Sequence, residues 1–152
     1  MRRITTKLGT LAAVALLALT TTQAARAESA SPSAPRAAAD APAYFKMQDI
    51  ARDEFIVKIT EAAKIAEARE IIADDSRKIL IGRIVKRKAD YNPRWDFHYN
   101  PDTVSFADMA IEVCDSTIRY TDDHLDEAGG AFLPGLYWCP WTGRLTEEVP
   151  AP

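Results

Sequence analysis

The chain has 152 residues and carries 19 Lys and Arg against 22 Asp and Glu, which gives a net charge of −3. A chain of this length predicts a single domain. Its acidic balance disfavours attachment to nucleic acid or to an anionic membrane through bulk charge, so we expect neither of these partners.

Residues 1–27 have the composition of a secretory signal peptide. They begin with a basic head that consists of Arg2, Arg3 and Lys7. An uncharged apolar run follows over residues 8–20, and Ala25 and Ala27 place small residues at a cleavage site. The run is too short for a membrane-spanning helix, and a retained membrane anchor is the alternative. Cleavage removes four bases and no acid, so the balance becomes 15 against 22, or −7, in a protein predicted to be secreted and extracellular.

Residues 28–43 are rich in Ala, Ser and Pro and contain no large apolar side chain. Such a segment cannot bury enough apolar surface to offset the entropy of ordering it, so it predicts a disordered linker. Residues 44–149 then form a single globular domain, which is long enough for one modest hydrophobic core.

The domain begins with a strand pattern that is followed by a helix pattern. Phe55, Val57 and Ile59 recur at every second position, which predicts a half-buried strand over residues 54–59. Residues 61–72 carry apolar side chains at steps of three and four among charged ones. This spacing predicts an amphipathic helix.

Residues 77–88 are strongly basic and contain five apolar side chains, of which four are β-branched, with Gly82 among them. This composition favours a twisted strand, and a helix is the alternative. Residues 95–99 alternate aromatic with polar side chains after an Asn-Pro turn. They predict a short second strand that forms a hairpin with the basic one.

The rest of the domain combines two further helices with a loop. Residues 105–114 carry apolar side chains at helical spacing, and residues 118–127 predict a second short helix that ends at a Gly-Gly pair. Residues 131–143 are apolar but interrupted by Pro and Gly, which indicates a structured loop, and residues 145–149 suit an edge strand. The predicted fold is α+β, with about three helices on one small, mainly antiparallel sheet of about four strands.

The two Cys residues of an exported domain of this size predict one disulfide, between Cys114 and Cys139. Two buried free thiols are the alternative, because Cys is among the residue types most often fully buried.

Aromatic, acidic and Gly-Pro residues are concentrated between Tyr91 and Trp141. This stretch includes Asn92-Pro93-Arg94-Trp95, Asp122-Asp123-His124-Leu125 and Trp138-Cys139-Pro140-Trp141. It resembles the N-terminal domain of the calmodulin-binding protein family typified by a seventy-four-kilodalton protein, and the likeness extends from Asp53 to Val149. The resemblance implies calmodulin as a partner, for which the candidate residues are Arg83 and Lys86 in the basic stretch.

The loop over residues 131–141 is the predicted binding site. It carries aromatic and apolar side chains of the kinds that anchor protein interfaces, namely Phe132, Leu133, Tyr137, Trp138 and Trp141. A bond from Cys139 would hold this loop against the segment that ends at Cys114 and so preorganise it. The alternative is that these side chains cover the core.

The sequence contains no nucleophile elbow, phosphate loop or dinucleotide motif, so we assign no catalytic residue. The two His and two Cys residues lack the paired spacing of a zinc site, and the acidic run lacks the pattern of a calcium loop, so we predict no metal or other cofactor. We predict a secreted, non-enzymatic binding module with an unknown protein partner. The alternatives are a protease inhibitor that uses the 131–141 loop and a metal-assisted hydrolase at Asp122, Asp123 and His124.

Overall fold

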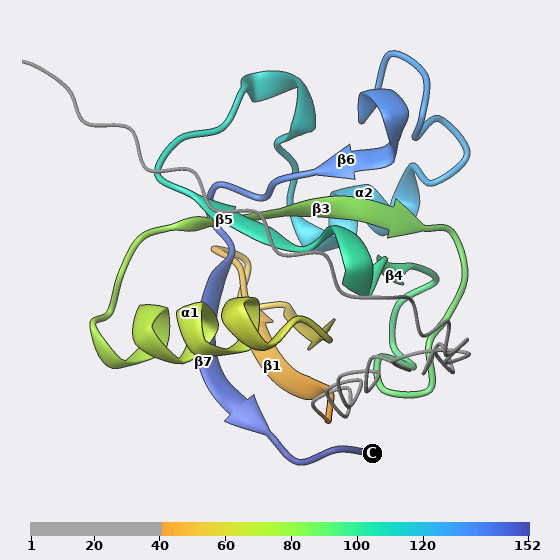
Figure 1. Ribbon diagram of the computed structural model, residues 1–152. Coiled ribbons are helices and arrows are strands. Elements are labelled where there is room, and N and C mark those ends of the chain that lie inside the picture. Colours follow the sequence, from red (N-terminus) through yellow and green to blue (C-terminus); the bar gives the residue numbers. More distant parts are fainter. Residues whose placement is uncertain (1–40) are drawn as a thin grey trace, which may run out of the picture. The chain divides into compact units, whose positions relative to one another are not determined.

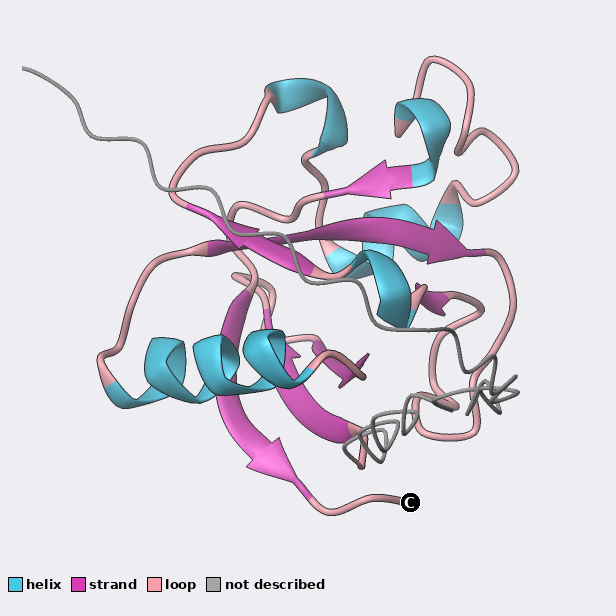
Figure 2. Ribbon diagram, viewed as in Figure 1, coloured by secondary structure: helices cyan, strands magenta, loops and turns pink. Residues whose placement is uncertain are grey.

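The computed structural model describes residues 41–152 (Figures 1 and 2). The predicted signal peptide lies outside the described residues, as does the predicted linker up to residue 40. Two antiparallel sheets and two α-helices make up the described part. The α+β class is therefore confirmed.

The first sheet contains three strands in the order β2-β1-β7. Strand β1 spans Ala43–Gln48, β2 spans Glu54–Ile59 and β7 spans Arg144–Val149. Phe45 of β1 lies opposite Val57 of β2, and both are fully buried because the two strands turn the same face to the core. The last strand of the chain thus lies beside the first strand of the described part, as Figure 1 shows.

The second sheet is built around one longer strand, β3. Strand β3 spans Ile79–Val85 and pairs with β4 (His98–Tyr99), β5 (Ser105–Ala107) and β6 (Tyr137–Trp138). A Cβ atom on Gly82 would lie 2.8 Å from Cδ1 of the Tyr99 ring, so glycine at this position lets that ring pack directly on the strand. The predicted hairpin between the basic and aromatic strands is confirmed, although β4 is only two residues long.

The first helix, α1, spans Ala62–Ala73 and buries Ile65, Ala68 and Ile71 on one side, as the sequence pattern predicts. The second, α2, is shorter than predicted and spans Ile118–Asp123. Thr117 caps it, because its side-chain oxygen accepts a hydrogen bond from Tyr120 N. Within residues 41–152, no helix has the length and apolar composition needed to cross a membrane.

One hydrophobic core draws side chains from both sheets. Phe55 of β2 places its ring centroid 4.9 Å from that of Phe97, 5.9 Å from that of Tyr99 and 5.4 Å from that of Trp138. Edge-to-face contacts of this kind add to the stabilisation from buried area. The aromatic cluster therefore joins the two sheets.

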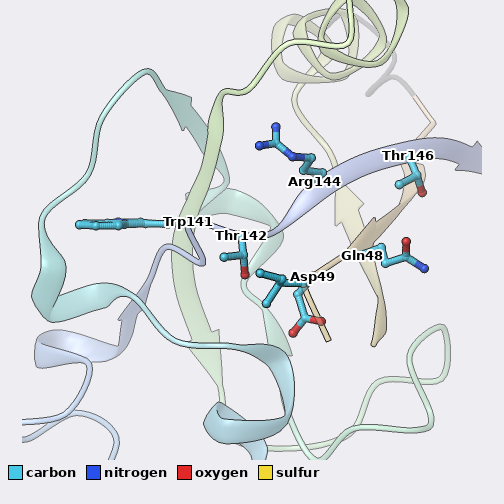
Figure 3. A pocket seen from close by; sticks show the side chains of 7 residues that line it. Gln48, Asp49, Trp141, Thr142, Arg144 and Thr146 are labelled. Atoms are coloured by element: carbon cyan, nitrogen blue, oxygen red, sulfur yellow. The ribbon is translucent and has the colours of Figure 1, made fainter. Parts of the chain in front are cut away.

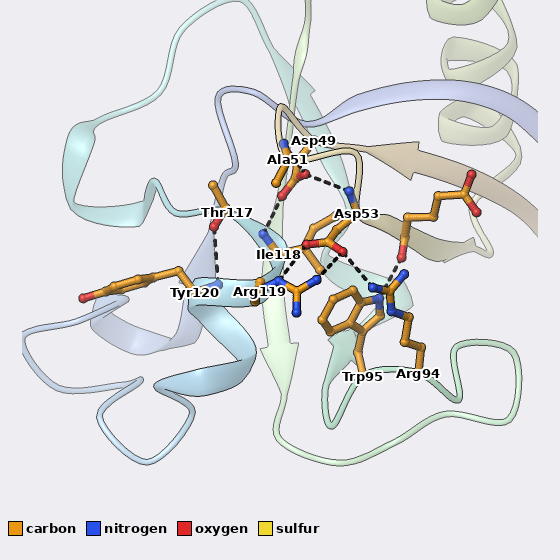
Figure 4. Close-up of polar contacts among 10 residues, drawn as sticks. Asp49, Ala51, Asp53, Arg94, Trp95, Thr117, Ile118, Arg119 and Tyr120 are labelled. Atoms are coloured by element: carbon orange, nitrogen blue, oxygen red, sulfur yellow. Dashed lines mark hydrogen bonds and ion pairs between the residues drawn. The ribbon is translucent and has the colours of Figure 1, made fainter.

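A buried carboxylate, Asp49, fastens the β1–β2 turn to helix α2 (Figure 4). Its Oδ1 accepts hydrogen bonds from Ala51 N at 2.9 Å and Asp53 N at 3.1 Å, and its Oδ2 accepts one from Ile118 N at 3.0 Å. The negative charge also lies at the helix N-terminus, where it is favourable. One side chain thus satisfies three backbone donors from two distant segments.

Replacement of Asp49 by Ala is expected to lower the free energy of unfolding by about 2 kcal/mol, because buried N–H groups lose a charged acceptor. Asp126→Ala removes an exposed carboxylate and serves as the control, with an expected change within about 0.5 kcal/mol. Urea unfolding of the two variants and the unchanged chain measures both values. Equal stabilities for the two variants would show that the Asp49 hydrogen bonds do not hold these segments together.

A second buried carboxylate, Asp53, lies beside the first and pairs with two arginines. Arg94 and Arg119 each place an Nη2 atom 2.8 Å from Asp53 Oδ1. Arg94 also lies over the indole of Trp95, 4.7 Å from the ring centroid, and Trp95 donates from Nε1 to the carbonyl of Glu54 at 2.7 Å. These contacts place the turn after β3 against the first sheet.

The predicted single sheet is wrong, because the four predicted strand segments belong to two sheets. Strand β1 was not predicted at all, although Phe45 and Met47 alternate with Lys46 and Gln48. The signal is weak because it is short and directly follows an Ala- and Pro-rich segment. Trp95 and Phe97 lie in a turn before β4 rather than in a strand, yet both are buried as their apolar character requires.

The predicted helix over residues 105–114 is also wrong, and the number of α-helices in residues 41–152 is two rather than three. Residues 105–107 form β5, whose Phe106 pairs with Leu80 of β3. The chain then leaves the sheet and makes only a 3-10 turn at Glu112–Cys114. Pairing with β3 and the link at Cys114 override a weak helical pattern.

Candidate functional site

The predicted disulfide between Cys114 and Cys139 is confirmed. Their Cα atoms are 5.2 Å apart, and Cys139 N donates a hydrogen bond to the carbonyl of Cys114 at 2.8 Å. Trp141 N donates in turn to Asp115 Oδ1 at 2.8 Å. These contacts fasten the segment that ends at Cys114 to the strand that leads out of β6.

Residues 108–113 form an exposed segment between β5 and the disulfide. Met109 is 84% exposed, Ile111 is 70% exposed and Val113 is 56% exposed. Two more large apolar side chains near this segment are partly exposed, Tyr137 at 47% and Trp141 at 43%. We call these five residues the exposed apolar cluster.

Two grooves connect the members of the exposed apolar cluster. One groove of about 250 Å³ is lined by Ile81, Ala110, Ile111, Val113, Pro134 and Tyr137. The other, of about 260 Å³, is lined by Ile79, Asp108, Met109, Ala110 and Trp141. Ala110 borders both grooves, so they flank the 108–113 segment on either side and form one continuous apolar surface over β3.

A third hollow, of about 330 Å³, is polar and lies at the ends of β1 and β7 (Figure 3). Gln48, Asp49, Thr142 and Arg144 line it. The carboxylate of Asp49 is engaged by three backbone donors, so it is committed to the fold. Figure 3 shows the Trp141 ring extending away from Arg144, and Trp141 therefore marks the border between this hollow and the apolar surface.

The charged groups around the apolar surface are arranged unequally. Within residues 41–152, neither Asp108 nor Glu112 takes part in an ion pair or a side-chain hydrogen bond. Lys78, the base nearest Asp108 along the strand direction, lies 2.9 Å from Glu67, and this hydrogen bond raises the pKa of Lys78. Hydrogen bonds from Lys64 and Lys78 lower the pKa of Glu67 in turn. The nearby base is thus already paired.

Arg83 lies at the Tyr137 end of the surface. Its guanidinium carbon is 5.9 Å from the centroid of the Tyr137 ring, and its Nε donates to the carbonyl of Gly135 at 3.1 Å. A cation over an aromatic face is attracted to it. The contact holds Arg83 against the 134–137 turn and fixes a positive charge there.

The structure divides the predicted binding residues into two groups. Leu133 and Trp138 are fully buried and belong to the core, which is the alternative that the sequence left open. Phe132 packs partly against the core and lies 5.5 Å from the Tyr120 ring. Tyr137 and Trp141 remain exposed and belong to the apolar surface.

The basic residues Arg83 and Lys86 are exposed, the first in β3 and the second directly after it. The stretch is a strand, as predicted, so the alternative of a target helix is wrong. Its apolar side chains are divided between the two faces of a sheet and cannot form a helical stripe.

Sequence reasoning missed Met109, Ile111 and Val113, because it assigned this segment to a helix with its apolar side in the core. A signal was present in their spacing. The three residues recur at every second position, with Ala110 and Glu112 between them. This period is that of extended backbone rather than of a helix.

The residues proposed for a hydrolase do not form a metal-binding group. Within residues 41–152, no three His, Cys, Asp or Glu side chains come close enough together to hold a metal ion. Asp122 accepts a hydrogen bond from Asp96 N at 2.8 Å, and burial raises its pKa. His124 stacks on Tyr120 with ring centroids 4.0 Å apart, and its Nδ1 lies 2.8 Å from the Tyr120 carbonyl oxygen. Both side chains serve local structure.

Comparison with known proteins finds one family. The sequence model of the N-terminal domain of binding protein 74 matches residues 41–152, which is the whole described part. No curated protein and no solved structure matches the chain. The resemblance carried by the stretch from Tyr91 to Trp141 is thereby confirmed. The chain belongs to the family of the binding protein 74 N-terminal domain.

Proposed function

We propose that this domain is an exported, non-enzymatic module that binds a partner protein through the exposed apolar cluster. One observation carries the proposal, the gathering of Met109, Ile111, Val113, Tyr137 and Trp141 on one surface with two grooves between them. Soluble proteins rarely leave contiguous apolar surface uncovered unless it serves an interaction.

The covalent link beside the cluster supports the same function. The disulfide and the hydrogen bond from Cys139 N to the Cys114 carbonyl both act at the end of the 108–113 segment. Holding a loop in one conformation before binding reduces the entropy lost in the complex. The disulfide is also compatible with an extracellular location, because such bonds persist in oxidising compartments.

Affinity capture from culture fluid tests this proposal, with the full chain as bait and with a variant that carries Met109→Ser and Ile111→Ser. We expect the unchanged chain to retain a defined partner and the double variant to lose it, because the apolar anchors carry most of the binding free energy. Ile50→Ser is the matched control, since Ile50 is 76% exposed but lies outside the cluster.

Retention of the same partner by the double variant would disprove the assignment of this surface. Loss of the partner in both the double variant and the Ile50 control would point to general loss of exposed apolar surface instead. Intact mass of the exported chain tests the location, and a mass that still includes residues 1–27 would contradict a cleaved leader.

A further inference from the structure

We infer that the segment docked on the exposed apolar cluster is a basic amphipathic one, with apolar side chains on one side and Lys or Arg beside them. This inference rests on the proposed function and specifies the chemistry of its partner. It is carried by the shape of the two grooves together with the charges at their rim.

The grooves are suited to side chains rather than to a small-molecule ligand. Each has a volume of about 250 to 260 Å³, and they lie next to each other with Ala110 between them. Pockets for drug-sized ligands are usually larger, roughly 300–1,000 Å³, and more enclosed. Two small neighbouring apolar grooves instead match successive anchor side chains on one side of a peptide segment.

The 108–115 segment combines apolar anchors with acidic groups. It contains Asp108, Glu112 and Asp115 and no basic residue. Asp115 is engaged by Trp141 N, whereas the carboxylates of Asp108 and Glu112 are without a partner in the described part of the chain. A basic side chain next to an apolar anchor would pair with one of them.

The charge of the whole described part favours the same partner over a second copy of this chain. Residues 41–152 contain 14 Lys and Arg and 20 Asp and Glu, a net charge of 14 − 20 = −6. Two copies therefore repel each other, and so do this surface and an anionic membrane. A cationic segment is attracted by the overall charge as well as by the two local carboxylates.

Arg83 gives the docked segment a direction. It lies over Tyr137 at one end of the surface, whereas Asp108 lines the groove at the Ile79 end of β3. A base on the partner is repelled at the first end and attracted at the second. The segment should therefore place its basic side chains toward Asp108 and Glu112.

A synthetic amphipathic peptide tests this inference, built from Leu at helical spacing with Lys at the other positions. Its affinity for the full chain is measured by calorimetry beside that of a Leu–Glu peptide with the same spacing. Three variants are compared: Asp108→Asn with Glu112→Gln, Met109→Ser with Ile111→Ser, and the control Asp126→Asn with Glu127→Gln. The control removes the same charge from exposed positions in the turn after α2.

We expect the Leu–Lys peptide to bind and the Leu–Glu peptide not to bind. The rim variant and the cluster variant should each weaken binding by about tenfold or more, and the control by less than about twofold. Added salt should weaken binding to the unchanged chain more than to the rim variant, because the rim charges are screened. Circular dichroism confirms that each variant is folded.

Other outcomes separate failure of this inference from failure of the proposed function. If the cluster variant loses the peptide while the rim variant behaves like the control, the basic partner is disproved and the docking surface remains. If the cluster variant binds normally, both proposals fail. Cosedimentation of the chain with phosphatidylcholine vesicles that depends on Met109 and Ile111 would identify a membrane as the occupant and overturn the inference. Cluster-dependent dimerisation in analytical ultracentrifugation would overturn it equally, in favour of a second copy.

Discussion

Replacing Trp138 by Ala is expected to lower the free energy of unfolding by about 3–5 kcal/mol. The side chain is fully buried, and its ring lies 5.4 Å from Phe55, 5.1 Å from Phe97 and 5.0 Å from Tyr99 between centroids. Its Nε1 also donates to the carbonyl of Ser116 at 3.1 Å. The substitution leaves a cavity between the two sheets and an unpaired carbonyl beside it.

Trp141→Ala is the matched control, because it removes the same side chain three positions further along. Trp141 is 43% exposed and lies at the edge of the apolar surface. We expect its loss to cost less than about 1 kcal/mol. Chemical unfolding followed by far-ultraviolet circular dichroism measures both variants. Similar losses for the two substitutions would contradict the distinction between a core tryptophan and a surface tryptophan.

This distinction determines how binding experiments on the domain are designed. A variant that lacks Trp138 loses binding through loss of folded protein, since about 3–5 kcal/mol is a large part of the stability of a small domain. Trp141, Met109 and Ile111 are the positions at which truncation reports on contact with a partner, because their side chains are exposed.

The fold could be predicted from the sequence where hydrophobic spacing is regular over a sufficient length. Helix α1 and strand β2 follow directly from apolar residues at helical and alternate positions. Strand β3 follows from its β-branched residues, even with Gly82 in its middle. What the spacing could not supply is partnership between distant segments. The pairing of β7 with β1 joins the two ends of the described part, and no local pattern encodes it.

The candidate site was predicted in part, for a related physical reason. Tyr137 and Trp141 were identified from residue type, but so were Leu133 and Trp138, because the residue types that anchor interfaces also fill cores. In addition, Met109 and Val113 fit a helical pattern together with Phe106 and Ala110. Only the pairing of Phe106 with Leu80 and the disulfide at Cys114 decide that these side chains point to solvent.

The disulfide is expected to have the second large effect on stability. It closes a loop across a sequence separation of 25 residues, which contains helix α2 and strand β6. In the chain-entropy model a loop of this size stabilises the folded state by about 3–4 kcal/mol, because the unfolded chain has fewer conformations. Unlike the Trp138 contacts, which act within the core, this link acts between the core and the exposed 108–113 segment.

A double variant with both Cys114 and Cys139 replaced is therefore expected to lose about 3–4 kcal/mol in the free energy of unfolding. The Ala and Ser double variants should agree within about 1 kcal/mol, because the effect comes from the cross-link rather than from the new side chains. Amide hydrogen exchange should rise in residues 108–113 and remain slow in β1 and β2, since only the former depend on Cys114 for their anchor. Unchanged exchange in the 108–113 segment would mean that the hydrogen bonds from Cys139 N and Trp141 N are sufficient to hold it. In that case the surface would be preorganised by backbone contacts, and reducing the disulfide would leave peptide binding intact.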